Sequence, residues 1–176
     1  SDMDVSDIRS MCCRLRLDLK ELRRRNGGLF GSGDSTGSIG VVTINLPRVA
    51  YENKGSKEGF YKALDEYLDI AKDSLNIKRE WLQKNILETG AIPAFKEYVG
   101  TLDNHFSTIG VVGENECCVN FMGKDILSDE GKSFAIEIGN HIRAKLLEYQ
   151  EESNCLYNYE ATPAESTCYR FALKDR

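Results

Sequence analysis

Apolar and polar residues follow two different periodicities along the chain, and the pattern predicts alternating strands and helices. Three short runs rich in β-branched and aromatic residues, 40–46, 106–112 and 155–159, are typical of strands. Apolar residues recur every three or four positions over 56–87, which predicts one long helix or two collinear ones. A further long helix is predicted over 128–151. Shorter helices are expected around 94–98, over 115–122 and over 163–172.

Residues that start or stop regular structure support these boundaries. Pro47 is expected to stop the first strand, and Gly90 and Pro93 the long helix, because proline cannot continue either element. Ser128 is a good N-cap, and Glu130 stands in the first turn of the helix that it would begin. The apolar face of that helix is expected to consist of Phe134, Ile136, Ile138, Ile142, Leu146 and Leu147.

The first forty residues are harder to assign. Residues 14–25 fit a strand by the alternation of Leu15, Leu17 and Leu19, but the spacing of Leu15, Leu19 and Leu22 also fits a helix. The glycine- and serine-rich stretch 27–40 predicts a loop. From there on, the order of strand, long helix, strand, helices, strand and helix indicates an α/β fold with crossover connections.

Composition narrows the function classes. A formal net charge of −5 and a pI near 5.2 give no general electrostatic reason to bind nucleic acid or a membrane surface. The polar and acidic residues 1–10 do not form a signal peptide, and no apolar run could span a bilayer, so a cytoplasmic protein is expected. None of the six cysteines forms a C-x-x-C pair, so we expect reduced thiols and no metal site.

One segment has the pattern of a phosphate site. Thr162 is a suitable N-cap, Pro163 suits the first helical position, and Glu165 would complete a capping box. A helix that starts directly after a strand exposes free backbone N–H groups, which attract phosphate oxygens, and Ser166 could add a hydroxyl donor. A well-capped helix without any ligand fits the same residues.

Four motifs in order along the chain carry a family resemblance. They are Met-Cys-Cys-Arg-Leu at 11–15, Gly-Ser-Ile-Gly-Val-Val-Thr-Ile-Asn-Leu-Pro-Arg at 37–48, Thr-Ile-Gly-Val-Val-Gly at 108–113 with Asn-Glu-Cys at 115–117, and Glu-Ala-Thr-Pro-Ala-Glu-Ser-Thr at 160–167. Together they resemble anaerobic (class III, glycyl-radical) ribonucleoside-triphosphate reductases over nearly the whole chain.

The resemblance implies a ten-stranded α/β barrel with long crossover helices, of which this chain would be about half, an internal fragment. Residues 1–176 would then be a partial catalytic barrel domain. Residues 1–40 would hold a finger-loop cysteine and a glycine-rich loop, and residues 41–176 would hold strand–helix units that end in the phosphate-binding helix start.

In that family a glycyl radical passes to a cysteine, whose thiyl radical abstracts the 3′-hydrogen of a ribonucleotide before the 2′-hydroxyl leaves as water. The resemblance places Cys13 at the finger loop, with Cys12 as the alternative. Without the resemblance, both would be interpreted as small buried hydrophobic residues, as are Cys117 and Cys118, and likewise Cys155 and Cys168.

The resemblance also implies the substrate-binding set. Glu160 would be the general base that accepts the 3′-hydroxyl proton, although a surface or capping carboxylate is an equally good interpretation. The residues expected to bind the ribonucleoside triphosphate are Asn158, Thr162, Ala164, Glu165, Ser166 and Ser38.

Departures from the family pattern suggest the reductant. Members that use formate resemble one another in a serine and an asparagine where this chain has Leu15 and, approximately, Ser38, and they tend to lack an acid at the place of Glu160. We therefore expect a protein thiol, thioredoxin- or glutaredoxin-like, as the reductant.

The segment has no Arg-x-x-Gly-aromatic motif and no pair of C-x-x-C motifs. The resemblance implies a glycyl radical made by an S-adenosylmethionine/iron–sulfur activase and a zinc site, all outside this segment, in a homodimeric enzyme. The segment alone should then yield no deoxynucleotide. Two alternatives stay open: a non-catalytic nucleotide-binding or interaction module, and a structural half-barrel that associates through its strand edges.

Overall fold

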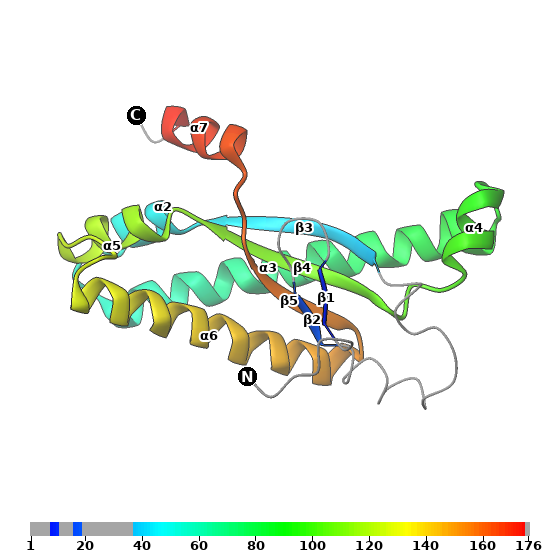
Figure 1. The fold of residues 1–176 in the computed structure, drawn as a ribbon, viewed down its shortest axis with the longest axis horizontal. Coiled ribbons are helices and arrows are strands. Elements are labelled where there is room, and N and C mark those ends of the chain that lie inside the picture. Colours follow the sequence, from blue (N-terminus) through cyan, green and yellow to red (C-terminus); the bar gives the residue numbers. More distant parts are fainter. Residues whose placement is uncertain (1–7, 11–15, 19–36, 175–176) are drawn as a thin grey trace.

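Two long helices lie against the same face of a three-stranded parallel sheet (Figure 1). The strands are β3 (Gly37–Asn45), β4 (His105–Val112) and β5 (Leu156–Ala161), and β4 lies in the middle. Helix α3 (Lys57–Leu82) packs on β3 and β4, whereas α6 (Asp129–Ser153) packs on β5. The α/β fold expected from the sequence is therefore confirmed.

The structure, a computed structural model, describes residues 8–10, 16–18 and 37–174, and describes side chains within 37–174. Strands β1 (Ile8–Ser10) and β2 (Arg16–Asp18) pair antiparallel in a sheet of their own, with Ser10 opposite Arg16. Of the two interpretations of residues 14–25, the strand is confirmed for 16–18. Cys12 and Cys13 stand between these strands in sequence and lie outside the described residues.

The sheet follows the order of the chain, β3–β4–β5, with both pairings parallel. A parallel pair needs a crossover connection, and crossovers share one hand. When the sheet also grows in one direction, successive crossover helices must fall on the same side. This geometry explains why α3 and α6 cover one face and why no long helix of the described residues covers the other face of the sheet.

The hydrophobic core lies between the sheet and these two helices. Ile109 and Val111 of the central strand are 0% and 1% exposed and point toward the helices. Burying each such side chain stabilises the fold by about 1.5–3 kcal/mol. The other main members of this cluster are Ile44, Phe60, Leu64, Leu68, Leu75, Phe134, Ile138, Ile142, Leu146 and Tyr157.

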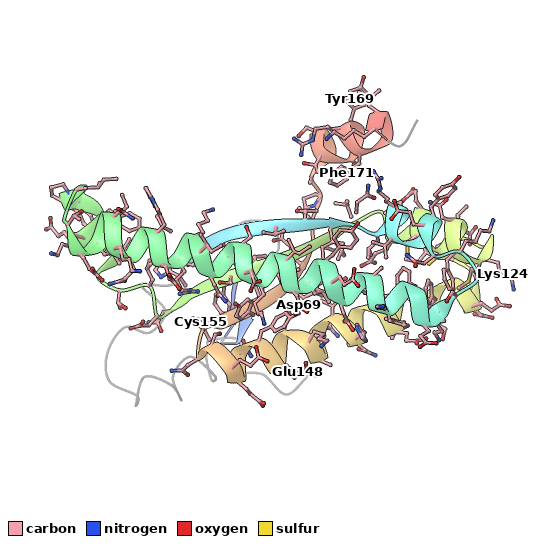
Figure 2. The ribbon with its side chains drawn as sticks, turned by 180° about the vertical axis from the view of Figure 1, so that it is seen from behind. Asp69, Lys124, Glu148, Cys155, Tyr169 and Phe171 are labelled. Atoms are coloured by element: carbon pink, nitrogen blue, oxygen red, sulfur yellow. The ribbon has the colours of Figure 1, made fainter. Side chains whose placement is uncertain are left out.

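Polar pairs connect α3 to α6 along the edge of this core. The partners are separated by 76 to 80 residues throughout, so the two helices run parallel. Asp69 accepts a 2.6 Å hydrogen bond from the buried Tyr149 hydroxyl, and Figure 2 shows Asp69 on the α3 face toward α6. Lys72 lies over the Tyr149 ring, 4.6 Å from its centroid. The remaining pairs are Lys57–Glu137 (2.7 Å), Asp65–His141 (2.6 Å) and Lys72–Glu152 (3.2 Å).

Shorter elements complete the described chain. They are α2 (Leu46–Glu52), the π-helical turn η3 (Gln83–Glu88) that extends α3, α4 (Pro93–Val99), α5 (Glu114–Met122) and α7 (Glu165–Lys174). Except for α2, each lies within a few residues of a predicted helix. None of the helices in the described residues is long and apolar enough to cross a membrane.

The boundaries of β3 differ from the prediction at both ends. The strand begins at Gly37, within the expected loop, because 37–40 pair with the start of β4. It ends at Asn45, whose side chain accepts a 3.3 Å hydrogen bond from the Arg48 backbone N–H and starts α2. Pro47 therefore lies in the first turn of a helix, where its missing N–H costs nothing, and does not merely stop a strand.

The predicted apolar face of α6 is partly wrong. Phe134, Ile138, Ile142 and Leu146 are buried, but Ile136 is 54% and Leu147 is 59% exposed. A helix shows only a stripe of its surface to the sheet, and these two residues lie beyond that stripe.

The Tyr149–Asp69 hydrogen bond predicts a measurable stability effect. Tyr149→Phe should lower the free energy of unfolding by about 1–2 kcal/mol, because the ring stays packed while the carboxylate loses its donor. Urea denaturation checks this. Tyr169→Phe is the matched control, since Tyr169 is 68% exposed and should change stability by less than about 0.5 kcal/mol. Equal stabilities for wild type and Tyr149→Phe would contradict the prediction.

Candidate functional site

The face of the sheet opposite α3 and α6 carries a group of polar side chains. In β4, Ser107, Ile109 and Val111 contact the helix side, so the alternation of a strand directs Thr108 and Gly110 to the opposite face. Tyr157 and Tyr159 of β5 likewise face the helices. Asn158 and Glu160 therefore point to the same side as Thr108.

Strand register brings these residues together. Thr108 is paired with Asn158, and Gly110 is paired with Glu160. The Ser38 hydroxyl of β3 lies 3.4 Å from the Thr108 hydroxyl, within hydrogen-bond distance. A polar row thus crosses three strands from Ser38 through Thr108 to Asn158, with Glu160 two residues further along β5.

Several of these groups are buried without a partner. No hydrogen-bond partner within the described residues reaches four of these buried atoms: the nitrogen and oxygen of the Asn158 amide, Oε1 of Glu160 and Oγ1 of Thr162. Glu160 as a whole is only 8% exposed. Because buried polar groups are nearly always hydrogen-bonded in proteins, such a cluster marks a place where a polar ligand could supply the missing partners.

The segment after β5 corrects the predicted capping box. The Thr162 backbone N–H donates to the Val111 carbonyl at 3.0 Å and so continues the strand ladder. Helix α7 starts at Glu165, and its first turn includes a 2.9 Å hydrogen bond from the Cys168 N–H to the Ala164 carbonyl. Thr162 is therefore not the N-cap, because its backbone is still hydrogen-bonded to β4 and α7 begins only at Glu165.

The same segment carries α7 away from the sheet. The chain crosses the face opposite α3 before α7 begins (Figure 1, Figure 2). Glu165 and Ser166 are exposed, while Ala164 is partly buried. Of the predicted substrate-binding residues, the structure brings Ser38, Asn158 and Thr162 to one face together with Glu160, but Glu165 and Ser166 lie beyond it on α7.

A hollow lies between α7, the end of β3 and α3. It has a volume of about 380 Å³ and its lining includes Thr43, Tyr67, Phe171 and Lys174. In Figure 2, Phe171 points from α7 toward the sheet and Tyr169 points away from it. The unpartnered groups of Asn158 and Glu160 do not line this hollow, so the two features are separate.

Side-chain hydrogen bonds on the helix side of the sheet fix the positions of β5 and β4, whose opposite face carries the polar row. The Tyr159 hydroxyl donates a 2.7 Å hydrogen bond to Glu114, and burial raises the pKa of Tyr159 well above its usual range. At the start of β4, the Arg79 guanidinium donates to the Leu102 carbonyl at 2.7 Å and to the His105 carbonyl at 2.6 Å. Burial, followed by the Arg79 charge, lowers the pKa of His105.

The described cysteines differ in their burial. Cys117 and Cys118 are fully buried, as expected, and burial raises the pKa of the Cys117 thiol to about 12. The expectation of burial is wrong for Cys168, which is exposed on α7, while Cys155 is partly buried. Within 37–174 no group of three or more His, Cys, Asp or Glu side chains could hold a metal ion.

Two residues of this face were missed by the sequence prediction. Thr108 was taken as part of an apolar strand, although a threonine in an otherwise apolar, buried run is a signal of a polar role. Gly110 gives no such signal, because its importance depends on Thr162, which is brought to it only by the β4–β5 pairing.

Comparisons with known proteins agree with this geometry. The family model described as anaerobic ribonucleoside-triphosphate reductase matches residues 1–176. The chain is 28% identical over 157 residues to the anaerobic ribonucleoside-triphosphate reductase of Haemophilus influenzae, and 25% identical over 151 residues to that of Enterobacteria phage T4. Each alignment covers 81% of this chain, but only 22% and 25% of the relative.

Solved structures give the same result. The anaerobic ribonucleotide reductase from Thermotoga maritima with citrate in the active site matches with a TM-score of 0.73 and 29% identity, over 81% of this chain and 27% of that one. The structure of the same enzyme with glycerol in the active site matches with a TM-score of 0.73 and 31% identity, over 85% and 25%. The chain thus spans about a quarter of the length of the relatives it matches.

The buried Oε1 of Glu160, which has no hydrogen-bond partner within the described residues, predicts an effect on stability. Glu160→Gln should raise the free energy of unfolding by about 1 kcal/mol, because a neutral amide is cheaper to bury without a partner than a carboxylate. Chemical denaturation of both variants measures this. Glu165→Gln, in the exposed first turn of α7, is the control and should change stability by less than about 0.5 kcal/mol. A clear loss of stability in Glu160→Gln would show that the carboxylate has a structural partner.

Proposed function

We propose that this chain, which belongs to the anaerobic ribonucleoside-triphosphate reductase family, forms part of the catalytic barrel of such a reductase and carries its substrate site. The observation that supports the site most directly is the cluster of buried, unpartnered polar groups on the sheet face opposite the long helices. Its members include Asn158, Glu160 and Thr162, which the family resemblance had selected independently.

The sheet topology supports a barrel. Strands in sequential order with all long helices on one face can continue in the same sense until the sheet closes, with the helices outside. In this proposal the three described parallel strands belong to a ten-stranded barrel, and the polar row faces the barrel interior. Residues 1–40 would contribute the finger loop and residues 41–176 the strand–helix units.

The proposed reaction removes the 2′-hydroxyl of a ribonucleoside triphosphate. A glycyl radical, on a segment outside this chain, would take the hydrogen atom of a cysteine thiol, which would restore the glycine C–H bond and leave a thiyl radical. Cys13, with Cys12 as the alternative, would then take the hydrogen atom from C3′ as its S–H bond re-forms. Glu160 would accept the proton of the 3′-hydroxyl and return it to the 2′-hydroxyl, which would leave as water.

The other site residues would bind and orient the substrate. Asn158 can both donate and accept, and neither of its polar atoms has a partner in the described chain, so it suits the ribose hydroxyls. The backbone N–H groups at the start of α7, from Ala164 to Ser166, would receive the phosphates, since a helix N-terminus favours anions. Ser38 would complete the site from β3.

Completing the reduction requires a reductant that supplies two electrons. We propose a protein thiol, thioredoxin- or glutaredoxin-like, because Glu160 stands where formate-using members tend to lack an acid. The parent enzyme would be a homodimer that requires an S-adenosylmethionine/iron–sulfur activase and a zinc site outside this segment. The free cysteines of the described part favour a reducing compartment such as the cytoplasm.

Substitution of the two adjacent cysteines tests the radical assignment. In the full-length reductase that carries this segment, Cys13→Ser should yield no detectable deoxynucleotide, because a serine O–H bond is too strong for a glycyl radical to break. Cys12→Ser and the control Cys168→Ser should retain turnover. Deoxynucleotide formed by Cys13→Ser, measured after activation by chromatography, would refute the role of Cys13; loss in Cys12→Ser alone would transfer the role to its neighbour.

The reductant is tested by supplying it in two forms. The activated full-length reductase should turn over with a thioredoxin- or glutaredoxin-like dithiol and its reductase, and not with formate alone. Product is measured as deoxynucleotide per enzyme over time, with carbon dioxide release followed in the formate arm. Robust turnover with formate and no added thiol would overturn this part of the proposal.

A further inference from the structure

The central strand has a glycine at the middle of the proposed site. Gly110 lies on the face opposite the helices, beside Glu160 in the register of β5 and Thr43 in the register of β3. A glycine weakens a strand interior, because it adds conformational entropy to the unfolded chain and has no side chain to pack. In strands it often marks a place where another group approaches the backbone closely.

The group that approaches here is the Thr162 side chain. A Cβ atom placed on Gly110 would overlap with Oγ1 of Thr162, and it would also lie 3.3 Å from Thr162 Cβ and 3.5 Å from the Glu160 carbonyl oxygen. The Thr162 backbone is held in turn by its 3.0 Å hydrogen bond to the Val111 carbonyl. The space that a side chain at position 110 would fill is therefore occupied by the Thr162 hydroxyl.

This hydroxyl has no hydrogen-bond partner within the described residues, although it is buried. The packing against Gly110 thus fixes the position of a donor that nothing in the described chain uses. It lies on the same face as the unpartnered groups of Asn158 and Glu160. A hydroxyl placed in this way is suited to an oxygen atom of a bound ligand.

We propose that Gly110 is a positioning residue of the ribonucleotide site: the absence of a side chain at this position lets the Thr162 hydroxyl lie against the central strand, where it contacts an oxygen atom of the bound nucleotide. The inference rests on the proposed function. Gly110 does not touch the substrate through a side chain and acts through Thr162.

Substitutions at the two positions test this in the full-length reductase that carries the segment. Binding of each of the four ribonucleoside triphosphates is measured by calorimetry without activation, and the melting temperature of every variant is recorded. Thr162→Val should weaken binding about tenfold, the effect of one lost hydrogen bond, while Thr162→Ser should bind within about twofold of wild type. Gly110→Ala should weaken binding about tenfold or more and lower the melting temperature.

A double variant distinguishes the effect of Gly110 on the position of the Thr162 hydroxyl from its effect on packing. Gly110→Ala with Thr162→Ala removes the overlapping hydroxyl, so its melting temperature should recover relative to Gly110→Ala alone. Its affinity should equal that of Thr162→Ala alone, because Gly110 then has no hydroxyl left to position. Gly139→Ala is the control, since a Cβ there meets only the Tyr159 ring at an ordinary distance of 3.9 Å, and it should leave affinity unchanged.

Three results would overturn the inference. Wild-type affinity in Gly110→Ala, wild-type affinity in Thr162→Val, or a double variant much weaker than Thr162→Ala would each show that Gly110 does not act through this hydroxyl. If the wild-type reductase binds no ribonucleoside triphosphate at all, the proposed function fails first and the inference falls with it. The two failures are thus distinguished by the wild-type titration.

Discussion

The packing of α3 and α6 on one face of a parallel sheet is the constraint from which the rest of this structure follows. Both helices belong to crossovers of the same hand in a sheet that grows in one direction, so they must share a side. That side takes almost all of the large buried side chains, together with the Tyr149–Asp69 hydrogen bond that joins the helices. The opposite side carries the buried polar groups of Asn158 and Glu160, beside a smaller apolar contact between Leu156 and Phe106.

The polar face is costly for the fold and therefore informative about function. Leaving an amide, a carboxylate oxygen and a hydroxyl buried without partners opposes folding by about 1–3 kcal/mol for each neutral group. The core between the helices and the sheet offsets this cost. Such groups are satisfied when a polar ligand supplies their missing partners, and the ribonucleotide proposed above has the hydroxyl and phosphate oxygens to do so.

Much of the fold could be predicted because its signals are local. Ser128 does cap α6 as expected, and the three strands lie close to the predicted runs. What could not be predicted depends on distant residues. Gly37 joins a strand only because β4 pairs with it, and Thr162 does not cap α7 because its N–H is bonded to the Val111 carbonyl at the end of β4. For the site, the residues alone did not decide whether Glu160 is a general base or a surface or capping carboxylate, and only the family resemblance favoured the general base. The predicted radical cysteines, Cys12 and Cys13, lie outside the described residues.

The parallel topology also bears on how residues 37–174 reach their native state. Ser38 and Thr108, which meet across β3 and β4, are 70 residues apart, and Tyr149 and Asp69 are separated by 80. Contacts of such long sequence separation require large loops to close before they contribute any stability, and proteins rich in them fold slowly. Helices α3 and α6 can form early, but the sheet cannot be completed until both crossovers have been synthesised. Translation runs at roughly 5–20 residues per second. Partly synthesised chains would therefore expose unpaired strands for seconds.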